Sequence, residues 1–407
     1  MIIQKITALK KISINQYINQ IFVLYAFLIP VSRAGISILT ALLFLLWFFS
    51  DDFKGKIQFI KSNKTITYLL LFISFSILSL LWSENVSSGI YYIRKYWYYF
   101  TILVIATSVN KKYLQYAISA FLAGMFISEV LSYGIFFELW KFRNVPVDFP
   151  TPFMNHIQYS TFLAFTSLLL LNRIFYVPNL KHKTFYFVYF LTVTSNLFLN
   201  AGRTGQAAFV FSIFVVAFLN FKNKFLSFFA ILFFISVLLF TSYQISPLFK
   251  ARVDIGLSDI KKITQDENYC TSLGLRAGAW INAGEIFLDY PVFGTGVNND
   301  MTALIRNIDI NHPEMECVKE MPSYHNYFVQ TSVRLGFIGL FFYIMIYYSL
   351  IKLNIKDKQY YNMMIIFVSV YTLSSLVENV FHEQFTEAMF ALFVGIFIAQ
   401  NRIENEA

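Results

Sequence analysis

The sequence predicts an all-α polytopic membrane protein with about twelve transmembrane helices and one large loop outside the cytoplasm that itself contains helices. The hydrophobic fraction, the charged fraction and the arrangement of the apolar residues in long blocks predict this class. The 407 residues are 57% hydrophobic and only 14% charged, whereas a soluble domain carries about 25% charged residues. The apolar residues form long blocks, and a block of about 17–25 residues spans a bilayer as a helix. The basic residues are spread between these blocks, so the net charge of +9 does not indicate nucleic-acid binding.

Hydropathy places the twelve spans along the whole chain. The first two are short and share the turn from Pro30 to Gly35. No small-residue cleavage site follows the first apolar block, so we expect that block to remain as a helix. The predicted spans are 18–31, 34–50, 66–82, 93–109, 114–138, 158–172, 185–201, 205–220, 225–245, 334–351, 360–380 and 384–400.

Lysine and arginine in the short loops predict the orientation, because cytoplasmic loops carry an excess of these residues. Alternate loops contain 18 and 6 of them. We therefore expect both termini in the cytoplasm and the long segment after span nine on the opposite face, which is the periplasm of a Gram-negative bacterium. The poorer set is Arg33, Arg94, Lys95, Lys141, Arg143 and Arg203; the richer set is Lys5, Lys10, Lys11, Lys54, Lys56, Lys61, Lys64, Lys111, Lys112, Arg173, Lys181, Lys183, Lys222, Lys224, Lys352, Lys356, Lys358 and Arg402.

The expected domains are residues 1–245 with spans one to nine, residues 246–333 as a periplasmic loop domain, and residues 334–407 with spans ten to twelve. Ser272 is expected to cap a loop helix that runs through Asp289 and is followed by a glycine turn. Ser323 is expected to cap the helix that becomes span ten.

Both cysteines, Cys270 and Cys317, lie in this loop. A disulfide between them is permitted outside the cytoplasm, and two free thiols are the alternative.

Three residues on the loop side of the membrane are candidates for chemistry. Arg203 lies in the short turn Gly202–Gly205, where an arginine either anchors the chain at headgroup depth or donates to a phosphate. Arg276 opens the loop helix and is either an ordinary solvated arginine or a second phosphate ligand. His325, expected in the first turn of span ten, is either structural or a base that accepts a proton from a sugar hydroxyl.

Other polar residues near the same membrane face rank lower. His156 fits a packed or headgroup-bonded histidine, and Glu378 and His382 near the end of span eleven are similar, although an ionisable group inside a membrane is a site hypothesis by default. The sequence contains no metal-ligand motif and no Walker motif, so we expect no metal, no cofactor and no ATP-driven work.

These residues form a pattern that resembles the O-antigen ligase family, within the O-antigen ligase/polymerase superfamily. His325 and Asn326 are followed by nine residues and then by Gly336 and Gly339, as in that family's signature. The run from Leu275 to Trp280 and the Gly202–Gly205 turn also resemble family motifs. The resemblance covers the topology loosely and about 140 residues, from 200 to 340, by motif.

The resemblance implies a GT-C-like glycosyltransferase bundle in the bacterial inner membrane. A glycan on undecaprenyl diphosphate would be the donor, and a hydroxyl of lipid A-core the acceptor, with inversion and without metal or nucleotide. Arg203 and Arg276 match arginines thought to hold the diphosphate, and His325 matches the histidine proposed to activate the acceptor. Asn326 is expected to orient His325, and Gly336 and Gly339 to allow close helix packing.

Other functions remain open at this point. An O-antigen polymerase, which joins lipid-linked repeat units, shares the topology, and the intact histidine signature favours the ligase. A protein O-glycosyltransferase is less well supported, because those proteins usually carry more chain after the last spans. A lipid-linked glycan flippase would suit twelve spans, but such transporters show two related halves, and no internal repeat is visible here.

Overall fold

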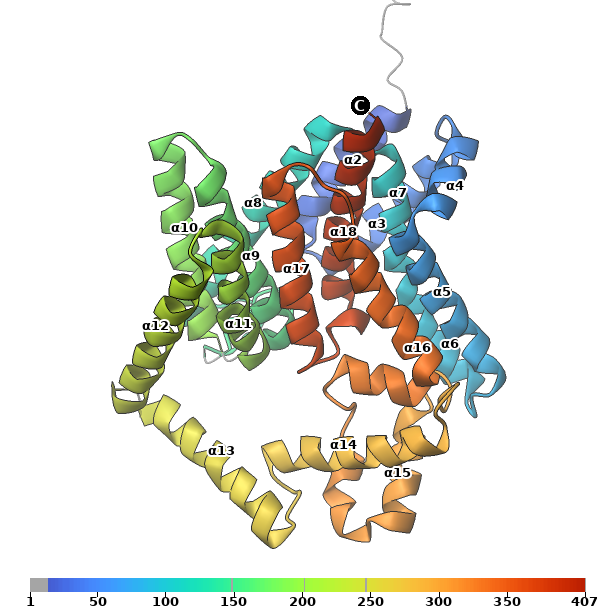
Figure 1. Cartoon of the computed structure of the whole chain (residues 1–407), viewed down its shortest axis with the longest axis vertical. Helices are drawn as coiled ribbons and strands as arrows, with labels where there is room; N and C mark the ends of the chain where they lie inside the picture. The colour runs from blue at the N-terminus through green and yellow to red at the C-terminus, as the bar shows by residue number, and fades with distance from the viewer. Residues whose placement is uncertain (1–13, 148, 201, 246, 407) are drawn as a thin grey trace, which may run out of the picture.

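The computed structural model describes residues 14–147, 149–200, 202–245 and 247–406. Within these ranges the chain is helical and contains no β-strand (Figure 1). In the first half the α-helices are α2 (Ile14–Leu28), α3 (Arg33–Phe48), α4 (Phe53–Ser62), α5 (Lys64–Leu78), α6 (Val86–Ile93), α7 (Thr101–Ser108), α8 (Lys111–Phe136), α9 (His156–Tyr176), α10 (Leu180–Leu199), α11 (Arg203–Asn220) and α12 (Lys224–Ile245). The second half has α13 (Pro247–Asp266), α14 (Ser272–Asp289), α15 (Asp300–Asn311), α16 (Tyr327–Ile351), α17 (Lys358–Ser375) and α18 (Gln384–Glu406). Short 3₁₀ helices are η1 (Ser79–Leu81), η2 (Arg94–Phe100), η3 (Pro313–Glu320) and η4 (Val380–His382).

Several of these helices have the length and apolar composition of membrane spans. Within the described ranges, four qualify by themselves, and a fifth is obtained if α3 and α4, which are bent by 112°, form one span. The chain is therefore a multi-pass helical membrane protein, and the full number of twelve crossings stays a prediction. The four helices are Lys64–Leu81, Lys111–Phe136, Arg203–Asn220 and Tyr327–Ile351.

Each predicted span overlaps a helix of the structure, and the start of the helix differs most from the prediction in the fourth and tenth spans. The sequence predicts one continuous helix over 93–109, but the structure has η2 over Arg94–Phe100 and only then α7. The 3₁₀ segment turns Tyr96, Tyr98 and Tyr99 into the core, and the Tyr99 hydroxyl donates to the Phe381 carbonyl at 2.6 Å. Lys5, Lys10 and Lys11, which contribute to the predicted orientation, lie outside the described residues.

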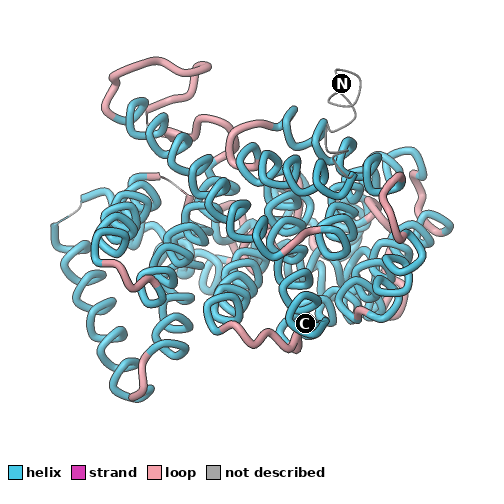
Figure 2. Tube along the Cα trace, turned by 90° about the horizontal axis from the view of Figure 1, so that it is seen from above, coloured by secondary structure: helices cyan, strands magenta, loops and turns pink. Residues whose placement is uncertain are grey.

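Helix α18 forms the centre of the bundle. Every residue from Phe385 to Gln400 is buried. Its neighbours include α7, η2, α17 and α8, and Phe393 packs edge-on against Phe165 of α9 and Phe121 of α8, with ring centroids 4.6 and 5.1 Å apart. Figure 2 shows the bundle from above, with most helices joined by short loops and one long loop at the upper left. The polar loop between α17 and α18 is held rigidly by this core, which matters for the site below.

The helices from α13 to α15 lie against one end of the bundle, which we call the loop face (Figure 1). Helix α14 ends at Asp289, as the sequence predicts, but its cap is Thr271 rather than Ser272, and the Thr271 side chain accepts from the Gly274 N–H. Small and aliphatic side chains of α14, α15 and η3 form a second hydrophobic core, separate from that of the bundle. A disulfide joins Cys270 to Cys317, with 5.7 Å between their Cα atoms. It ties the start of α14 to η3.

Candidate functional site

A carboxylate from the α17–α18 loop joins two of the residues that the sequence singles out. Glu378 Oε2 lies 2.8 Å from His325 Nδ1, and Glu378 Oε1 lies 3.0 Å from a terminal guanidinium nitrogen of Arg276. The Glu378 side chain is 9% exposed, whereas those of His325 and Arg276 are 24% and 32% exposed. The acidic group is thus mostly shielded, while its two partners still reach solvent. We call these three residues the Glu378 triad.

His325 is held in this place by the turn before α16. Its backbone has φ of 48°, a left-handed conformation that is uncommon for a residue other than glycine and that recurs at functional sites. Trp280 of α14 donates from its indole to the Tyr324 carbonyl at 2.8 Å, which anchors the turn to the loop helix. His325 therefore lies just before α16, and the expectation that it belongs to the helix's first turn is wrong.

The cap of α16 also differs from the expectation. Asn326, not Ser323, caps the helix, because its side chain accepts from the Phe328 and Val329 N–H groups. This contact uses the Asn326 oxygen on the backbone and gives no hydrogen bond to His325. Ser323 lies instead at the wall of a cavity described below.

A buried polar network supports the turn from below. Asp300 at the start of α15 pairs with Arg334, with 2.6 Å between Oδ1 and Nε. Gln330 donates to Asp300 and accepts from the Asn379 amide at 3.0 Å and from the Tyr324 N–H at 3.2 Å. Removing either partner of a buried ion pair is strongly destabilising, because the other charge is left buried and unpaired. The network connects the loop, α16 and the Glu378 segment into one unit.

The signature glycine Gly336 breaks α16 rather than packing it against another helix. Its φ is +60°, and a Cβ there would lie 2.4 Å from the Val292 carbonyl carbon. The freed backbone pairs with the glycine turn after α14: the Phe337 N–H donates to the Pro291 carbonyl at 2.8 Å, and the Thr295 N–H to the Val333 carbonyl at 2.9 Å. The break thus docks the loop onto the bundle.

Gly339 follows one turn later. A Cβ at this position would meet the Leu335 side chain at 2.1 Å, on the residue just before the break. Both glycines therefore serve the break and its docked turn, whereas the sequence suggested close packing between helices.

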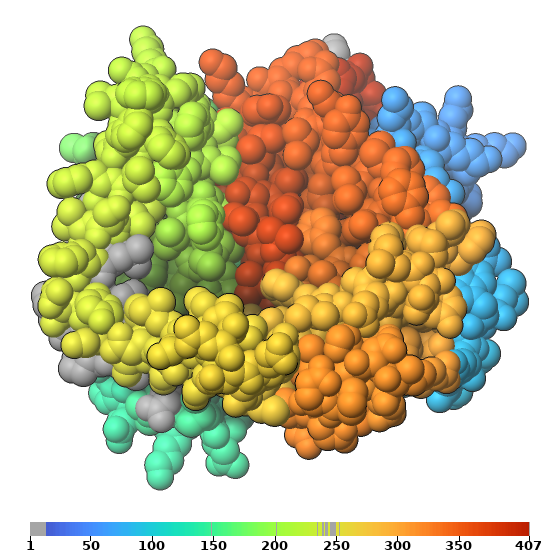
Figure 3. Space-filling view, turned by 60° about the horizontal axis from the view of Figure 1, so that its bottom comes forward, coloured from blue at the N-terminus to red at the C-terminus, as the bar shows by residue number. Residues whose placement is uncertain are grey.

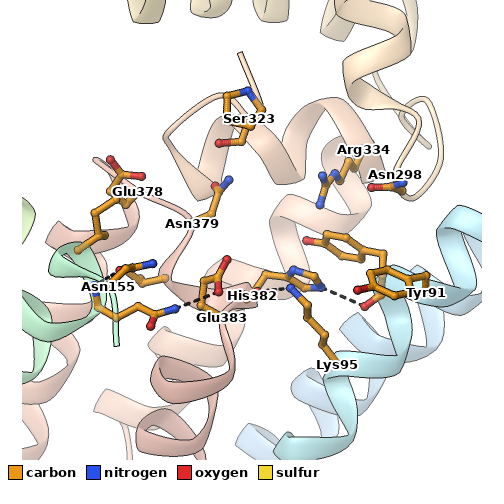
Figure 4. A pocket seen from close by; sticks show the side chains of 15 residues that line it. Tyr91, Lys95, Asn155, Asn298, Ser323, Arg334, Glu378, Asn379, His382 and Glu383 are labelled. Atoms are coloured by element: carbon orange, nitrogen blue, oxygen red, sulfur yellow. Dashed lines mark hydrogen bonds between the residues drawn. The ribbon is translucent and has the colours of Figure 1, made fainter. Parts of the chain in front are cut away.

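A polar cavity of about 340 Å³ opens beside the Glu378 triad (Figure 4). We call it the site cavity. Carboxylates, amides and two tyrosines line it, and Lys95 and Arg334 add positive charge. Gln158 of α9 donates to Glu383 at 2.9 Å across one wall. This mixture of hydrogen-bonding groups and aromatic faces suits a polyhydroxylated ligand.

His382 forms another wall of the site cavity. Its ring stacks on Tyr92, with centroids 3.4 Å apart, and its Nε2–H donates to the Tyr92 carbonyl at 3.0 Å. Burial lowers the pKa of His382 well below its usual value, and Lys95 and Arg334 lower it further. The imidazole is therefore neutral and acts as a fixed wall.

Arg203 is not in contact with the triad. It is the first residue of α11, exposed, and makes no ion pair with a described residue. Helix α11 packs on α9 and α17, and the Gly205 N–H donates to the Ser160 hydroxyl at 3.1 Å, which fixes the turn. Figure 3 shows a hollow on this side of the molecule, bordered by α11 and α12, by α17 and by the arm of α13 and α14. Arg203 and Arg276 belong to helices on different borders of this hollow.

Sequence reasoning ranked Glu378 too low and missed Asp300, Gln330 and Arg334. The signal for Glu378 was present, as a carboxylate at the end of an apolar stretch. Its two partners are 53 and 102 residues away in the chain, so only the fold brings the three together. Among the described residues, no group of three or more His, Cys, Asp or Glu side chains is arranged to hold a metal ion.

Two comparisons with known proteins bear on this site. An uncharacterized protein of Haemophilus influenzae (strain KW20 / Rd) is 24% identical over 375 residues, which make up 89% of this chain and 90% of that protein. The family described as O-Antigen ligase matches residues 188–344. That range contains Arg203, Arg276, His325 and both signature glycines. This match over residues 188–344 supports membership of the O-antigen ligase family.

Proposed function

We propose that this protein is an O-antigen ligase, a glycosyltransferase that moves a glycan from undecaprenyl diphosphate to a sugar hydroxyl of lipid A-core at the periplasmic face of the inner membrane. The observation that supports it most is the Glu378 triad, in which one carboxylate in the wall of the site cavity holds a histidine and an arginine. A base for the acceptor and a cation for the leaving group are what this reaction needs.

The proposed mechanism assigns each member of the triad a role. The Glu378 carboxylate accepts from Nδ1–H of His325, so that Nε2 of the neutral ring carries a lone pair. Nε2 takes the proton of the acceptor hydroxyl as its oxygen bonds to the anomeric carbon. The bond from that carbon to the diphosphate oxygen breaks at the same time, and direct displacement gives inversion.

The arginines stabilise the leaving group in this mechanism. Undecaprenyl diphosphate departs with additional negative charge, and fixed cations at that position lower the barrier. Glu378 engages one terminal nitrogen of Arg276, and the guanidinium has five N–H donors in all, so other donors remain for the diphosphate. Arg203 would contribute from the opposite border of the hollow. The energy of the phosphate–sugar bond drives the transfer, so ATP is not required.

The proposal also includes the wider architecture. We infer twelve crossings, a periplasmic loop domain over 246–333 and two cytoplasmic termini. The unequal loop charges support this arrangement, as does the placement of the triad at the loop face.

The decisive experiment removes the gene and examines the glycan. Long polymer stranded on the lipid carrier is the result expected for a ligase. A core capped by a single repeat unit would instead identify a polymerase, and repeat units trapped on the cytoplasmic side would identify a flippase.

Complementation then tests the triad. His325→Ala is expected to reduce transfer at least 100-fold, because general base catalysis contributes about 10²- to 10⁴-fold, while the protein level in the membrane is unchanged. Glu378→Gln is the second variant and should also reduce transfer. Glu378→Asp, which keeps the carboxylate, should retain part of the transfer activity that Glu378→Gln loses. Normal glycan attachment by His325→Ala protein would refute the catalytic assignment.

A further inference from the structure

Three of the six cations in the poorly charged set of loops gather around one cavity at the loop face. This cavity, of about 470 Å³, is lined by Arg94, Lys95, Trp97, Tyr98 and Gln384, and we call it the Trp97 cavity. Arg33 does not line it but is adjacent, because the Gln384 side chain donates to the Arg33 carbonyl at 2.9 Å and the Arg33 guanidinium lies near the ring of the next residue, Phe385. These cations come from two distant parts of the chain, so the fold gathers them.

None of the three has an acidic partner among the described residues. The Arg94 guanidinium lies 3.8 Å from the centroid of the Tyr91 ring, and the Arg33 guanidinium lies 5.4 Å from that of Phe385. The Lys95 ammonium has only a carbonyl, that of His382, at 3.4 Å. By contrast, Arg276 and Arg334 are each paired with a carboxylate. One interfacial arginine is explained by anchoring to headgroups, but three cations around one cavity, none of them in an ion pair with a described residue, leave a local excess of positive charge.

The aromatic residues of the Trp97 cavity suit a position at the lipid surface. Trp97 is half-buried and Tyr98 buried, and the Tyr98 hydroxyl shares a hydrogen bond of 2.9 Å with Ser37 of α3. Tryptophan and tyrosine are enriched at headgroup depth in membrane proteins. Fixed cations beside such rings form a site for an anionic lipid headgroup.

Lys95 connects this cavity with the site cavity, since it lines both. From Lys95, the site cavity continues past Asn379 to Glu378 and Ser323, next to His325 (Figure 4). A chain of sugars can hydrogen-bond to the amides along this path and stack on Tyr91. The path therefore runs from a cationic lipid-facing cavity to the proposed base.

We propose that the Trp97 cavity binds a phosphate group of the acceptor lipid, whose glycan extends through the site cavity to present its hydroxyl to His325. This rests on the proposed function and adds to it a place for the second substrate, separate from the arginines that face the donor diphosphate. The shared chemistry is a phosphate-bearing glycolipid. Lipid A-core supplies it in a ligase, and a diphosphate-linked repeat unit supplies it in a polymerase.

A binding measurement tests the proposal without turnover. The full-length protein is placed in nanodiscs of phosphatidylcholine, and its affinity is measured for lipid A-core with its phosphates, for the same lipid after dephosphorylation, and for a repeat unit on undecaprenyl diphosphate. The variant Arg33→Gln/Arg94→Gln/Lys95→Gln is compared with Lys141→Gln/Arg143→Gln, which removes two cations of the same loop set away from the cavity.

We expect the triple variant to bind the phosphorylated acceptor about 100-fold more weakly, because each cation near an anionic lipid contributes about a fivefold factor. Two controls distinguish this site from general surface charge. The control variant should bind the phosphorylated acceptor normally, and the wild-type protein should bind the dephosphorylated lipid poorly. If the diphosphate-linked unit alone shows the loss, the acceptor is that of a polymerase and the site still stands.

Equal binding of both phosphate-bearing lipids, lipid A-core and the diphosphate-linked unit, by wild-type and triple-variant protein would overturn the proposal, and so would an equal loss in the control variant. Arg94→Gln alone, at an exposed side chain, provides a milder second variant, with an expected loss of about fivefold. The proposed function can fail separately, since an active His325→Ala protein would refute the base without affecting these affinities.

Discussion

Gly336 is the residue at which the sequence signature and the backbone geometry can be compared most directly. The spacing from His325 to Gly336 identifies it, but spacing carries no information about φ. The structure shows why glycine is required: φ is +60°, and Val292 lies where a side chain would begin. The glycine is needed for the docking of the loop, and only through that docking for the position of His325.

Substitution of Gly336 by alanine should therefore damage the loop without changing any polar residue of the site. The strained φ costs about 1–3 kcal/mol, and the contact with Val292 adds to it. Gly284→Ala in α14 is the control, because nothing lies within 4 Å of its Cβ position. We expect rapid proteolysis between α13 and α16 and loss of transfer in the first variant, and neither in the second. Wild-type protease resistance of Gly336→Ala would contradict this explanation.

At the same scale, the sequence could identify His325, Arg203 and Arg276 but not their relation. Arg276 and His325 meet through Glu378, and Arg203 meets neither. The expected orienting contact from Asn326 is replaced by a helix cap. Side-chain partners across 50 to 100 residues depend on tertiary packing, which residue type and spacing do not determine.

Whether the sequence predicts the bounds of a helix correctly depends on how close in the chain the residues that determine those bounds are. Helix α14 ends at the predicted residue and begins within one residue of the predicted start, because its periodicity and the proline after it lie within about twenty residues. Helix α16 does not begin at its predicted start, because its first turns precede a break that exists only while the Pro291–Gly296 turn is docked. The 3₁₀ segment η2 is a similar case, in which tertiary contacts of its tyrosines override helical hydropathy.

The loop helices α14, α15 and η3 are expected to respond to pH through His312. Its Nε2 lies 2.9 Å from Glu285 and its Nδ1 3.2 Å from Glu314. The hydrogen bond to Glu285 raises the pKa of His312 above its ordinary value of 6.5, and hydrogen bonds from Asn307 and His312 lower the pKa of Glu285 below 4.5. A raised histidine pKa gives stability that is complete below pH 6.5 and lost as the pH rises through the raised value. The lowered glutamate pKa gives stability that is lost only in strong acid.

Limited proteolysis of the loop between pH 5 and pH 9 measures this effect. Cleavage in wild-type protein should accelerate as His312 loses its proton, whereas His312→Gln protein should be cleaved at a rate that is high throughout and nearly independent of pH. His182, at the other polar face of the predicted topology, offers a matched control, since His182→Gln should leave the wild-type profile unchanged. A pH profile that persists in His312→Gln protein would assign the effect to other groups.

For the whole molecule, composition predicts the membrane class and loop charge predicts an orientation, whereas the number of membrane spans is harder to predict. A chain with 14% charged residues and long apolar blocks has to be a membrane protein. Yet only some of its helices are long and apolar enough to span alone. The broken segments, such as α6 with η2 and α7, place polar and aromatic groups at the loop face instead of crossing in one regular helix. These irregular elements line the cavities, so the proposed functional region is the part of the chain that hydropathy predicts least well.

The orientation of the molecule is the remaining global prediction, and it determines whether the triad can meet a substrate outside the cytoplasm. Alternate short loops contain 18 and 6 basic residues, and the loop face shares its side with the smaller set. Both cysteines are joined in the disulfide, so an introduced cysteine provides a clean label. In spheroplasts, a membrane-impermeant maleimide should modify Ser258→Cys in α13 but not Lys222→Cys between α11 and α12, and permeabilisation should expose both. Labelling of Lys222→Cys in closed spheroplasts would show that the protein has the opposite orientation. The cavities and the triad would then face the cytoplasm, with its nucleotide-linked sugars.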